Sequence, residues 1–456
     1  MLAVLRHRAY RRLFAAQVVA LVGTGLATVA LGLLAYDLAG ADAGSVLGTA
    51  LAIKMVAYVV IAPAVGAVAD RLPRRALMVT ADLVRAGIAV SLPFVGEVWQ
   101  VYVLVFLLQS ASAAFTPTFQ AVIPDVLPEE RDYTRALSMS RLAYDLESLF
   151  SPALAAALLS VVTYDRLFTG TVLGFLASAA LVLSTALPER PASTLPRAGG
   201  VYARATAGTR LFLGVPALRA LLALNLAVAA AGAMVTVNSV VYVREVLGLS
   251  AGAVPLALGA YGAGSMAVAL ALPRVLNRVP DRTVMLPGAL SLAVVFAGLW
   301  AVTAARDGNW RLPALLVLWA AFGAASSAVL TPAGRLVRRS VEPGGRTAAF
   351  AAQFSLSHGC WLLTYPLAGW LGAAGLGRAV LALGAIALAA ALLAVRLWPP
   401  TGSKARSTAG SPAAPATTAH VHADLPLGHP HLVGALRVPT GWRHSHGHLA
   451  DGLHAR

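Results

Sequence analysis

The sequence GAVADRLPRR occupies residues 66–75, and the similar sequence NRVPDR occupies residues 277–282. Each arginine-rich stretch separates two long apolar blocks, and residues 277–282 follow residues 70–75 by 207 residues. A Thr-Pro pair at 116–117 recurs at 331–332, 215 residues later. We conclude that the chain consists of two halves with the same order of elements.

The apolar blocks predict a membrane protein. Hydrophobic residues make up 58% of the chain and charged residues 12%, whereas soluble proteins carry about 25% charged residues. Many blocks reach the roughly 20 residues that span a hydrocarbon core. Within lipid every backbone polar group needs an internal partner, so the blocks must be helical. We therefore predict an all-α integral membrane fold of twelve transmembrane helices in two pseudo-symmetric six-helix bundles.

Twelve spans follow from the positions of the apolar blocks. They cover residues 13–36, 45–66, 76–95, 100–120, 136–160, 166–187, 219–243, 251–272, 283–305, 312–332, 347–372 and 377–398.

Four regions follow from the spans. An N-terminal bundle covers residues 1–187, and a C-terminal bundle covers 219–398. Between them, residues 188–218 form a linker in which 202–213 is predicted to lie as a helix on the membrane surface. Residues 399–456 are predicted to be a disordered, histidine-rich tail.

Loop charges predict the orientation, because arginine and lysine concentrate in cytoplasmic loops. With the N-terminus inside, and with the first two residues of each span counted with the loop before it, the cytoplasmic segments before the tail hold 21 arginines and the outer loops hold five. Both termini are therefore expected in the cytoplasm. The excess of arginine over lysine (33 against 2) and the alanine richness suggest a bacterium with a GC-rich genome, and hence the bacterial inner membrane.

The loop at 66–75 resembles the signature of the major facilitator superfamily, over about residues 5–398. Its matching residues are Gly66, Asp70, Arg71, Arg74 and Arg75. The resemblance implies a latch that joins the two halves when the cytoplasmic side is closed. Physically, Asp70 offers an acceptor to helix N-termini, and the arginines offer charge-assisted hydrogen bonds. A positive-inside anchor is the simpler alternative.

The runs YDLAG (36–40), ADLVRAG (81–87) and FTP (115–117) narrow the resemblance to bacterial drug, macrolide and siderophore exporters. This resemblance implies secondary transport of a small molecule by alternating access, with the solute held at mid-membrane between parallel repeats. We expect the lipid bilayer as surroundings, a proton as the coupling ion, and a monomer. No nucleic-acid partner is expected, because the net charge of +16 resides in short loops.

Ionisable residues inside spans are costly and therefore candidates for function. Asp82 and Arg85 are three residues apart, which makes them neighbours on a helix. We interpret them first as a structural ion pair that supports the loop signature.

The span 136–160 carries three further charges. Arg141 and Asp145 share one stripe of the helix and can neutralise each other, whereas Glu147 lies on a different stripe without a local partner. Glu147 is therefore a candidate for proton or cation coupling. The alternative is that it pairs with Lys54 or with another helix.

Lys54 near the middle of its span could bind an anionic solute or form part of a gate. By resemblance the spans 45–66 and 347–372 face each other, so Lys54 and His358 are expected to share one cavity. A hydrogen-bonded packing role is the alternative for His358. Asn225 and Asn238 are expected to line the cavity as polar groups.

Histidines concentrate in the tail, and several alternate with one intervening residue. In an extended chain such residues share a face and can chelate Ni²⁺, Co²⁺ or Zn²⁺. The alternative is a solvated tail that binds metal incidentally. The candidate ligands are His420, His422, His429, His431, His444, His446 and His448.

Three functions remain open at this stage. The leading one is an exporter of small amphipathic molecules, and the second is a divalent-metal exporter for nickel or cobalt, since some related exporters carry histidine-rich tails. The third is a membrane sensor or accessory protein that transports nothing. An enzyme is not expected, and apart from metal at the tail no cofactor is expected, because no motif suggests a nucleophile or a phosphate-binding loop.

Overall fold

The computed structural model describes residues 2–39, 43–69, 72–159, 161, 163, 165–188, 201–249, 253–305, 308–398, 417–422, 436–438 and 441–447. The chain divides into two units, Met1–Trp398 and Pro399–Arg456. The first unit is helical in the residues described, and the second contains strands.

The helices of the first unit match the predicted spans. They are α1 (Arg8–Ala39), α2 (Ala43–Ala69), α3 (Arg74–Ser91), α4 (Val98–Val126), α5 (Glu130–Leu159), α6 (Asp165–Leu183), α7 (Val201–Gly214), α8 (Pro216–Val241), α9 (Val254–Val275), α10 (Asp281–Ala304), α11 (Arg311–Ser340), α12 (Arg346–Ala374) and α13 (Leu376–Leu397). Short turns of 3-10 helix lie at η1 (Leu2–Arg6), η3 (Leu92–Phe94) and η6 (Pro343–Gly345), and a π turn lies at η4 (Tyr242–Val246). The twelve predicted spans are confirmed as α1–α6 and α8–α13, and the residues 202–213, predicted as a helix, lie within α7.

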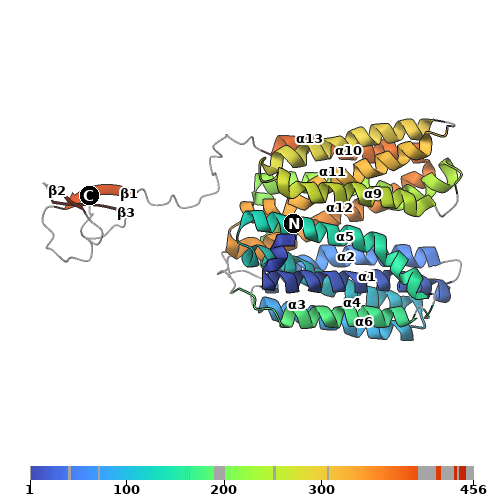
Figure 1. The fold of residues 1–456 in the computed structure, drawn as a ribbon, viewed down its shortest axis with the longest axis horizontal. Helices are drawn as coiled ribbons and strands as arrows, with labels where there is room; N and C mark the ends of the chain where they lie inside the picture. The colour runs from blue at the N-terminus through green and yellow to red at the C-terminus, as the bar shows by residue number, and fades with distance from the viewer. Residues whose placement is uncertain are drawn as a thin grey trace. The chain divides into compact units, whose positions relative to one another are not determined.

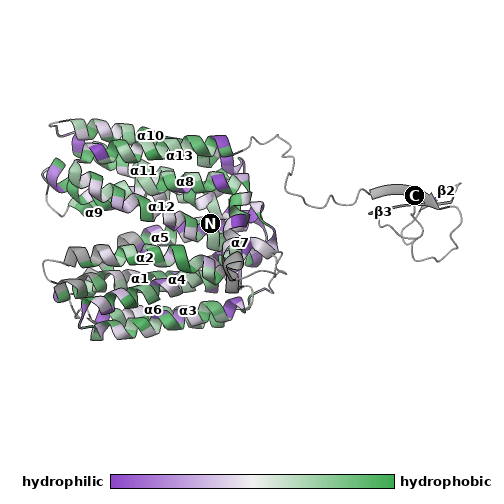
Figure 2. Ribbon diagram, turned by 180° about the vertical axis from the view of Figure 1, so that it is seen from behind, coloured by the Kyte–Doolittle hydropathy of each residue, from purple (hydrophilic) through white to green (hydrophobic). Residues whose placement is uncertain are grey.

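Nine of these helices are long and apolar enough to cross a membrane, counting the described residues. Helices α2, α5 and α12 are not among the nine, and α2 contributes a shorter apolar stretch at Thr49–Val65. Figure 2 shows hydrophobic residues along most of the helical ribbons and hydrophilic residues gathered at helix ends. Helices α2, α5 and α12 carry polar side chains whose positions are described below.

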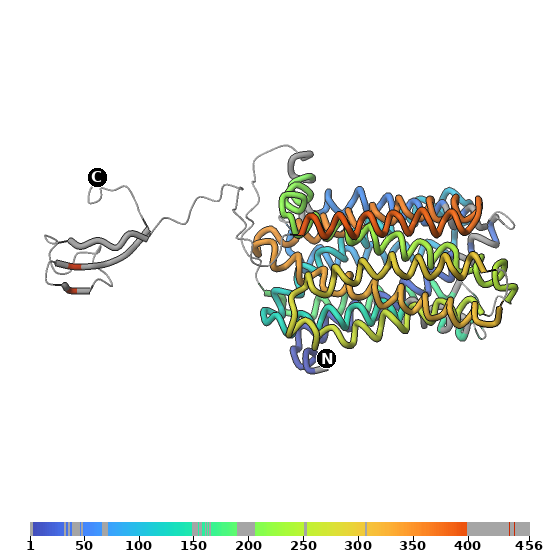
Figure 3. Tube along the Cα trace, turned by 90° about the horizontal axis from the view of Figure 1, so that it is seen from above, coloured from blue at the N-terminus to red at the C-terminus, as the bar shows by residue number. Residues whose placement is uncertain are grey.

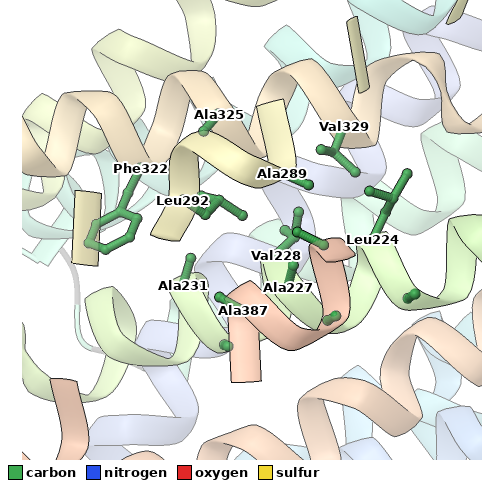
Figure 4. Packing of buried hydrophobic residues seen from close by; sticks show 14 of the residues in the cluster. Leu224, Ala227, Val228, Ala231, Ala289, Leu292, Phe322, Ala325, Val329 and Ala387 are labelled. Atoms are coloured by element: carbon green, nitrogen blue, oxygen red, sulfur yellow. The ribbon is translucent and has the colours of Figure 1, made fainter. Parts of the chain in front are cut away.

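The long helices form two groups, which we call the N-terminal half (α1–α6) and the C-terminal half (α8–α13). The groups lie beside each other in Figure 1, and Figure 3 shows the helices running side by side from a second direction. Buried apolar side chains hold each group together, because dispersion contacts accumulate in close packing. In the C-terminal half one such cluster contains Leu224, Val228, Leu292, Phe322 and Ala387, from four helices (Figure 4).

Glycine allows α9 and α11 to approach at backbone contact. A Cβ atom on Gly264 would lie 1.9 Å from the carbonyl oxygen of Ala320. A Cβ on Gly323 would lie 1.9 Å from the carbonyl oxygen of Tyr261. Small residues at such crossings are the usual means of packing helices in lipid, where the hydrophobic effect between helices is absent.

Proline and a side-chain hydrogen-bond acceptor stabilise the first turns of α8 and α4. Pro216 stands in the first turn of α8, where its missing N–H is not needed. At the start of α4 the Gln100 Oε1 atom accepts hydrogen bonds from the backbone N–H groups of Gly96 and Glu97 at 3.0 and 3.1 Å. These contacts satisfy donors that a helix N-terminus otherwise leaves unpaired.

One end of the first unit gathers arginines where helices begin or end. Arg74 begins α3, Arg338 and Arg339 lie in the last turn of α11, and Arg346 begins α12. We call this the arginine-rich end.

The second unit contains a three-stranded antiparallel sheet of β1 (Thr417–His422), β2 (Leu436–Val438) and β3 (Gly441–Gly447) in the order β1-β3-β2. These strands differ from the prediction that the whole tail lacks regular structure. The alternating pattern of His-Val-His and His-Ser-His suits strands as well as it suits an extended chain.

Candidate functional site

A cavity of about 580 Å³ lies between the two halves. Its walls come from α1–α5 of the N-terminal half and from α8, α11 and α12 of the C-terminal half. Pockets for drug-sized molecules have volumes in this range. The lining aromatic side chains are Tyr58, Phe115, Phe119, Tyr133, Tyr144, Phe350, Phe354, Trp361 and Tyr365.

Lys54 and Glu147 line this cavity from α2 and α5. They lie close enough to interact electrostatically, yet neither belongs to the ion pairs found among the described side chains. The Lys54 ammonium lies 5.7 Å from the centroid of the Tyr58 ring, a cation–π arrangement. The cavity wall therefore holds one positive and one negative group that interact without direct contact.

Arg141 and Asp145 form the ion pair expected from their spacing, at 3.0 Å. Ser265 of α9 joins them: its hydroxyl donates to Asp145 at 2.6 Å and accepts from Arg141 at 3.0 and 3.1 Å. Because α5 and α9 belong to different halves, this cluster links the halves beside the cavity.

His358 and Lys54 line the same cavity, as expected. The His358 Nδ1 atom donates to the carbonyl oxygen of Phe354 at 2.7 Å, and its ring lies 4.6 Å from the Tyr58 ring. The Tyr58 hydroxyl in turn donates to Gln109 at 2.8 Å. His358 thus has the contacts of a packing histidine while it also faces the cavity.

Asp82 and Arg85 form a buried ion pair within α3, as interpreted from their spacing. Ser178 donates to Asp82 at 2.7 Å, and the Arg85 guanidinium lies over the rings of Phe115 and Phe175 at 4.5 and 4.6 Å. These contacts compensate both charges, so the pair fits a structural role. Arg85 also reaches the cavity wall.

The loop signature is described in part. Asp70 and Arg71 lie outside the described residues, and the surroundings of Gly66 in α2 are not described. Arg74 pairs with Asp125 at the end of α4 at 2.6 Å. Arg75 donates to the carbonyl oxygen of Thr185 at 2.6 Å.

Further ion pairs bridge the two halves at the arginine-rich end. Asp125 of the N-terminal half also pairs with Arg346 of the C-terminal half at 3.4 Å. Glu130 at the start of α5 pairs with Arg335 and Arg339 of α11, each at 2.6 Å.

The same two arginines pair with Asp281, which begins α10, at 3.1 and 3.0 Å. The whole set, which we call the ion-pair latch, consists of Arg74, Asp125, Glu130, Asp281, Arg335, Arg339 and Arg346.

Sequence reasoning did not single out Asp125, Glu130, Arg335 or Arg339. The repeat gave a signal that could have found them, because these residues follow the repeated Thr-Pro pairs in the two halves. Their partners lie 50 or more residues away, so spacing along one helix does not predict the pairing.

The two asparagines of α8 differ. Asn225 lines the cavity, whereas Asn238 does not belong to its wall. The Asn238 Nδ2 atom instead donates to the carbonyl oxygen of Ala368 at 3.3 Å, which ties α8 to α12. The expectation that both line the cavity therefore holds for Asn225.

The histidines of the tail fall into two sets. His420, His422, His444 and His446 belong to β1 and β3. His429, His431 and His448 lie outside the described residues. Among the side chains that the structure describes, no group of three or more His, Cys, Asp or Glu could hold a metal ion.

The family model of the Major Facilitator Superfamily matches residues 13–316 and 242–444. The chain belongs to this superfamily. The major facilitator fold, the two halves and the cavity between them accord with that membership. The resemblance noted at residues 66–75 is thereby confirmed at the level of the family.

Two bacterial relatives are called Macrolide efflux protein A. The one from Enterococcus faecalis is 31% identical over 153 residues, which cover 31% of this chain and 47% of the relative. The one from Streptococcus pyogenes is 29% identical over 182 residues, which cover 39% of this chain and 44% of the relative. The matches therefore span less than half the length of these relatives.

Solved transporter structures share the fold of this facilitator. The human organic anion transporter MFSD10 superposes with a TM-score of 0.70 at 15% identity, covering 85% of this chain and 99% of the other. The Escherichia coli fucose:proton symporter FucP superposes with a TM-score of 0.65 at 14% identity, covering 86% and 98%. These likenesses establish the architecture alone.

Proposed function

We propose that this facilitator exports small amphipathic molecules of the macrolide type. The observation that carries the proposal is the cavity of about 580 Å³ that both halves line, with aromatic rings beside charged and polar groups. Such a wall suits a molecule that is apolar over much of its surface and polar at a few points. The similarity to macrolide efflux proteins supports export and this class of substrate.

Alternating access is the mechanism we propose. The ion-pair latch holds the arginine-rich end together, and opening that end requires its bridges between the halves to break. We place the arginine-rich end and both termini in the cytoplasm of a bacterium, with the protein acting as a monomer in the inner membrane. The arginine distribution among the loops supports this orientation.

Coupling to protons is proposed to involve Glu147. It lines the cavity without belonging to a described ion pair, and Lys54 is the nearby charge of opposite sign. Protonation of Glu147 would remove its attraction for Lys54. Exchange of a proton at this carboxylate can therefore alternate with binding of the exported molecule.

The test is accumulation of erythromycin, a macrolide, in a bacterial host that lacks its own exporters. Cells with the protein are expected to accumulate less erythromycin, and collapse of the proton gradient should abolish the difference. Equal accumulation with correct membrane insertion would contradict export and favour the sensor function.

The variant Glu147→Gln tests the coupling residue. Proton-driven export should be lost, whereas exchange of labelled erythromycin across vesicles without a gradient should persist. Glu342→Gln is the matched control, because Glu342 is an exposed carboxylate in the loop before α12. Unchanged gradient dependence in Glu147→Gln would remove Glu147 from the mechanism.

A further inference from the structure

Three side chains in the cavity wall carry buried polar atoms without a hydrogen-bond partner among the described residues. They are both amide atoms of Asn225 on α8, the Oε1 atom of Gln353 on α12 and the hydroxyl of Tyr133 on α5. Asn225 is 3% exposed and Tyr133 is fully buried. Together they offer donors and acceptors from both halves to one cavity.

Buried polar groups are nearly always paired in folded proteins, because an unpaired group keeps its full desolvation cost. Within the part of the chain that the structure describes, both the donor and the acceptor of the Asn225 amide lack a partner. A group with this cost that faces a cavity is expected to pair with what the cavity binds.

The second asparagine of α8, Asn238, shows that a buried amide on this helix can find hydrogen-bond partners within the protein. Asn238 is as buried as Asn225 but donates to the Ala368 carbonyl oxygen at 3.3 Å and to the Met234 sulfur at 3.6 Å. The unpaired amide is therefore specific to the asparagine in the cavity wall.

The charges around the cavity favour a ligand group without net charge. Arg85 and Arg141 are already paired with carboxylates of their own helices. Lys54 and Glu147 have opposite signs and interact with each other. A hydroxyl or amide group, which both donates and accepts, matches the free amide of Asn225 better than an anion or a cation does.

We propose that Asn225, Gln353 and Tyr133 form a subsite that binds an uncharged, hydroxyl-bearing part of the exported molecule, such as a sugar substituent. The proposal rests on the proposed export function and names the chemistry that the cavity selects. The aromatic side chains of the same cavity, such as Phe350, Trp361 and Tyr365, hold the apolar remainder.

The variant Asn225→Leu tests the subsite, since leucine branches at Cγ as asparagine does and has no hydrogen-bonding group. Resistance to erythromycin, whose sugars carry hydroxyl groups, is expected to fall about tenfold or more, the loss typical of removed polar contacts in a buried site. Resistance to ethidium, an amphipathic cation without hydroxyl groups, should change less than about twofold. The thermal midpoint of the purified protein should stay equal or rise, because an unpaired buried amide has been removed.

Asn238→Leu is the matched control on the same helix. It loses a hydrogen bond between helices, so its thermal midpoint should fall while the ratio of erythromycin to ethidium resistance is kept. Erythromycin should raise the thermal midpoint of the wild-type protein and not that of Asn225→Leu.

Two results would overturn the subsite. One is wild-type-like erythromycin resistance in Asn225→Leu, and the other is a lowered thermal midpoint in that variant with equal loss for both compounds. If the wild-type protein exports neither compound, the proposed function fails instead, and the ligand-induced shift of the thermal midpoint still tests binding.

Discussion

The two halves close the arginine-rich end with charges of opposite sign at corresponding helix ends. In the N-terminal half, Arg74 begins α3 and pairs with Asp125 at the end of α4. In the C-terminal half, Asp281 begins α10 and pairs with Arg339 at the end of α11. The residues that pair with the other half also have opposite signs: Glu130 begins α5 and Arg346 begins α12.

The helix dipole stabilises the ion pair of one half more than that of the other. A helix N-terminus favours negative charge and a C-terminus favours positive charge. Asp281 and Arg339 each lie at the end of a helix that suits their sign, whereas Arg74 and Asp125 each lie at the end that does not. We infer that the pair in the C-terminal half is the stronger of the two.

The comparison teaches that both halves place charged residues at the same helix ends, with opposite signs in the two halves. Each half places one ionic residue where a helix begins and another where the next helix ends. The latch residues of the N-terminal half are net negative and those of the C-terminal half net positive, so the halves attract each other at this end. Four experiments, from the largest expected effect to the smallest, test the comparison.

The contact between α9 and α11 should tolerate larger side chains less than any other site in the C-terminal half. Gly323→Leu places side-chain atoms where the backbone of α9 lies, because a Cβ there would be 1.9 Å from the Tyr261 carbonyl oxygen. Overpacking of this kind is expected to cost more than about 3 kcal/mol. Size-exclusion chromatography should show loss of monodisperse protein.

The N-terminal half supplies the control for that substitution. Leu108 stands 215 residues before Gly323, and this half accommodates it in α4. Leu108→Ile should leave a monodisperse protein. A well-folded Gly323→Leu protein would contradict the close approach of α9 and α11.

The two acidic residues of the latch should differ in their contribution to stability. Asp281→Asn leaves Arg335, which is 5% exposed, with a weakened set of partners, and it removes a charge that the α10 dipole favours. Loss of a buried charge partner costs about 3 kcal/mol. Thermal unfolding should show the larger loss for this variant.

Asp125→Asn should cost about 1 kcal/mol less than Asp281→Asn, because removal of Asp125 also relieves an unfavourable dipole interaction. Equal losses for the two variants, or a greater loss for Asp125→Asn, would contradict the inferred inequality of the halves.

The ion pairs of Glu130 and of Arg346, which connect the two halves, should differ in how strongly they keep the arginine-rich end closed. Glu130 makes two ion pairs of 2.6 Å, and Arg346 makes one bridge of 3.4 Å. Glu130→Gln should therefore expose the cavity at the arginine-rich end more than Arg346→Gln does. Labelling of Ser140→Cys, a cavity position, by a thiol reagent in a Cys360→Ser background measures this exposure.

Labelling of Ser140→Cys with the latch intact is the reference rate for both variants. If Arg346→Gln speeds labelling more than Glu130→Gln, the bridge to Asp125 is the stronger one and the comparison must be reversed.

The smallest effect is expected at the ion pair of Asp132 with Arg135, at 2.8 Å near the start of α5. It is partly exposed, and the corresponding positions of the C-terminal half are Thr347 and Phe350, which carry no charge. Exposed pairs contribute about 0–1 kcal/mol. Asp132→Asn should barely move the thermal midpoint, and a loss as large as that of Asp281→Asn would make this pair part of the latch.

Much of the fold could be predicted from the sequence, because a span in lipid must be a long apolar helix whatever its neighbours are. The ion pairs of Asp82 with Arg85 and of Arg141 with Asp145 also followed from spacing along one helix. The different fates of Asn225 and Asn238 did not follow, because which helix faces an asparagine depends on packing. The strands of the tail were missed because alternation of histidine fits an extended chain with or without a partner strand.

The sequence by itself determined the number of helices, their order and the twofold repeat, since hydropathy and loop composition act locally along the chain. Only the tertiary structure decided which charges meet across the halves and which cavity-lining polar atoms stay unpaired among the described residues. The reason is physical: a hydrogen bond or ion pair forms between groups a few ångströms apart in space, and residues such as Glu130 and Arg335 reach that distance only after the halves pack together.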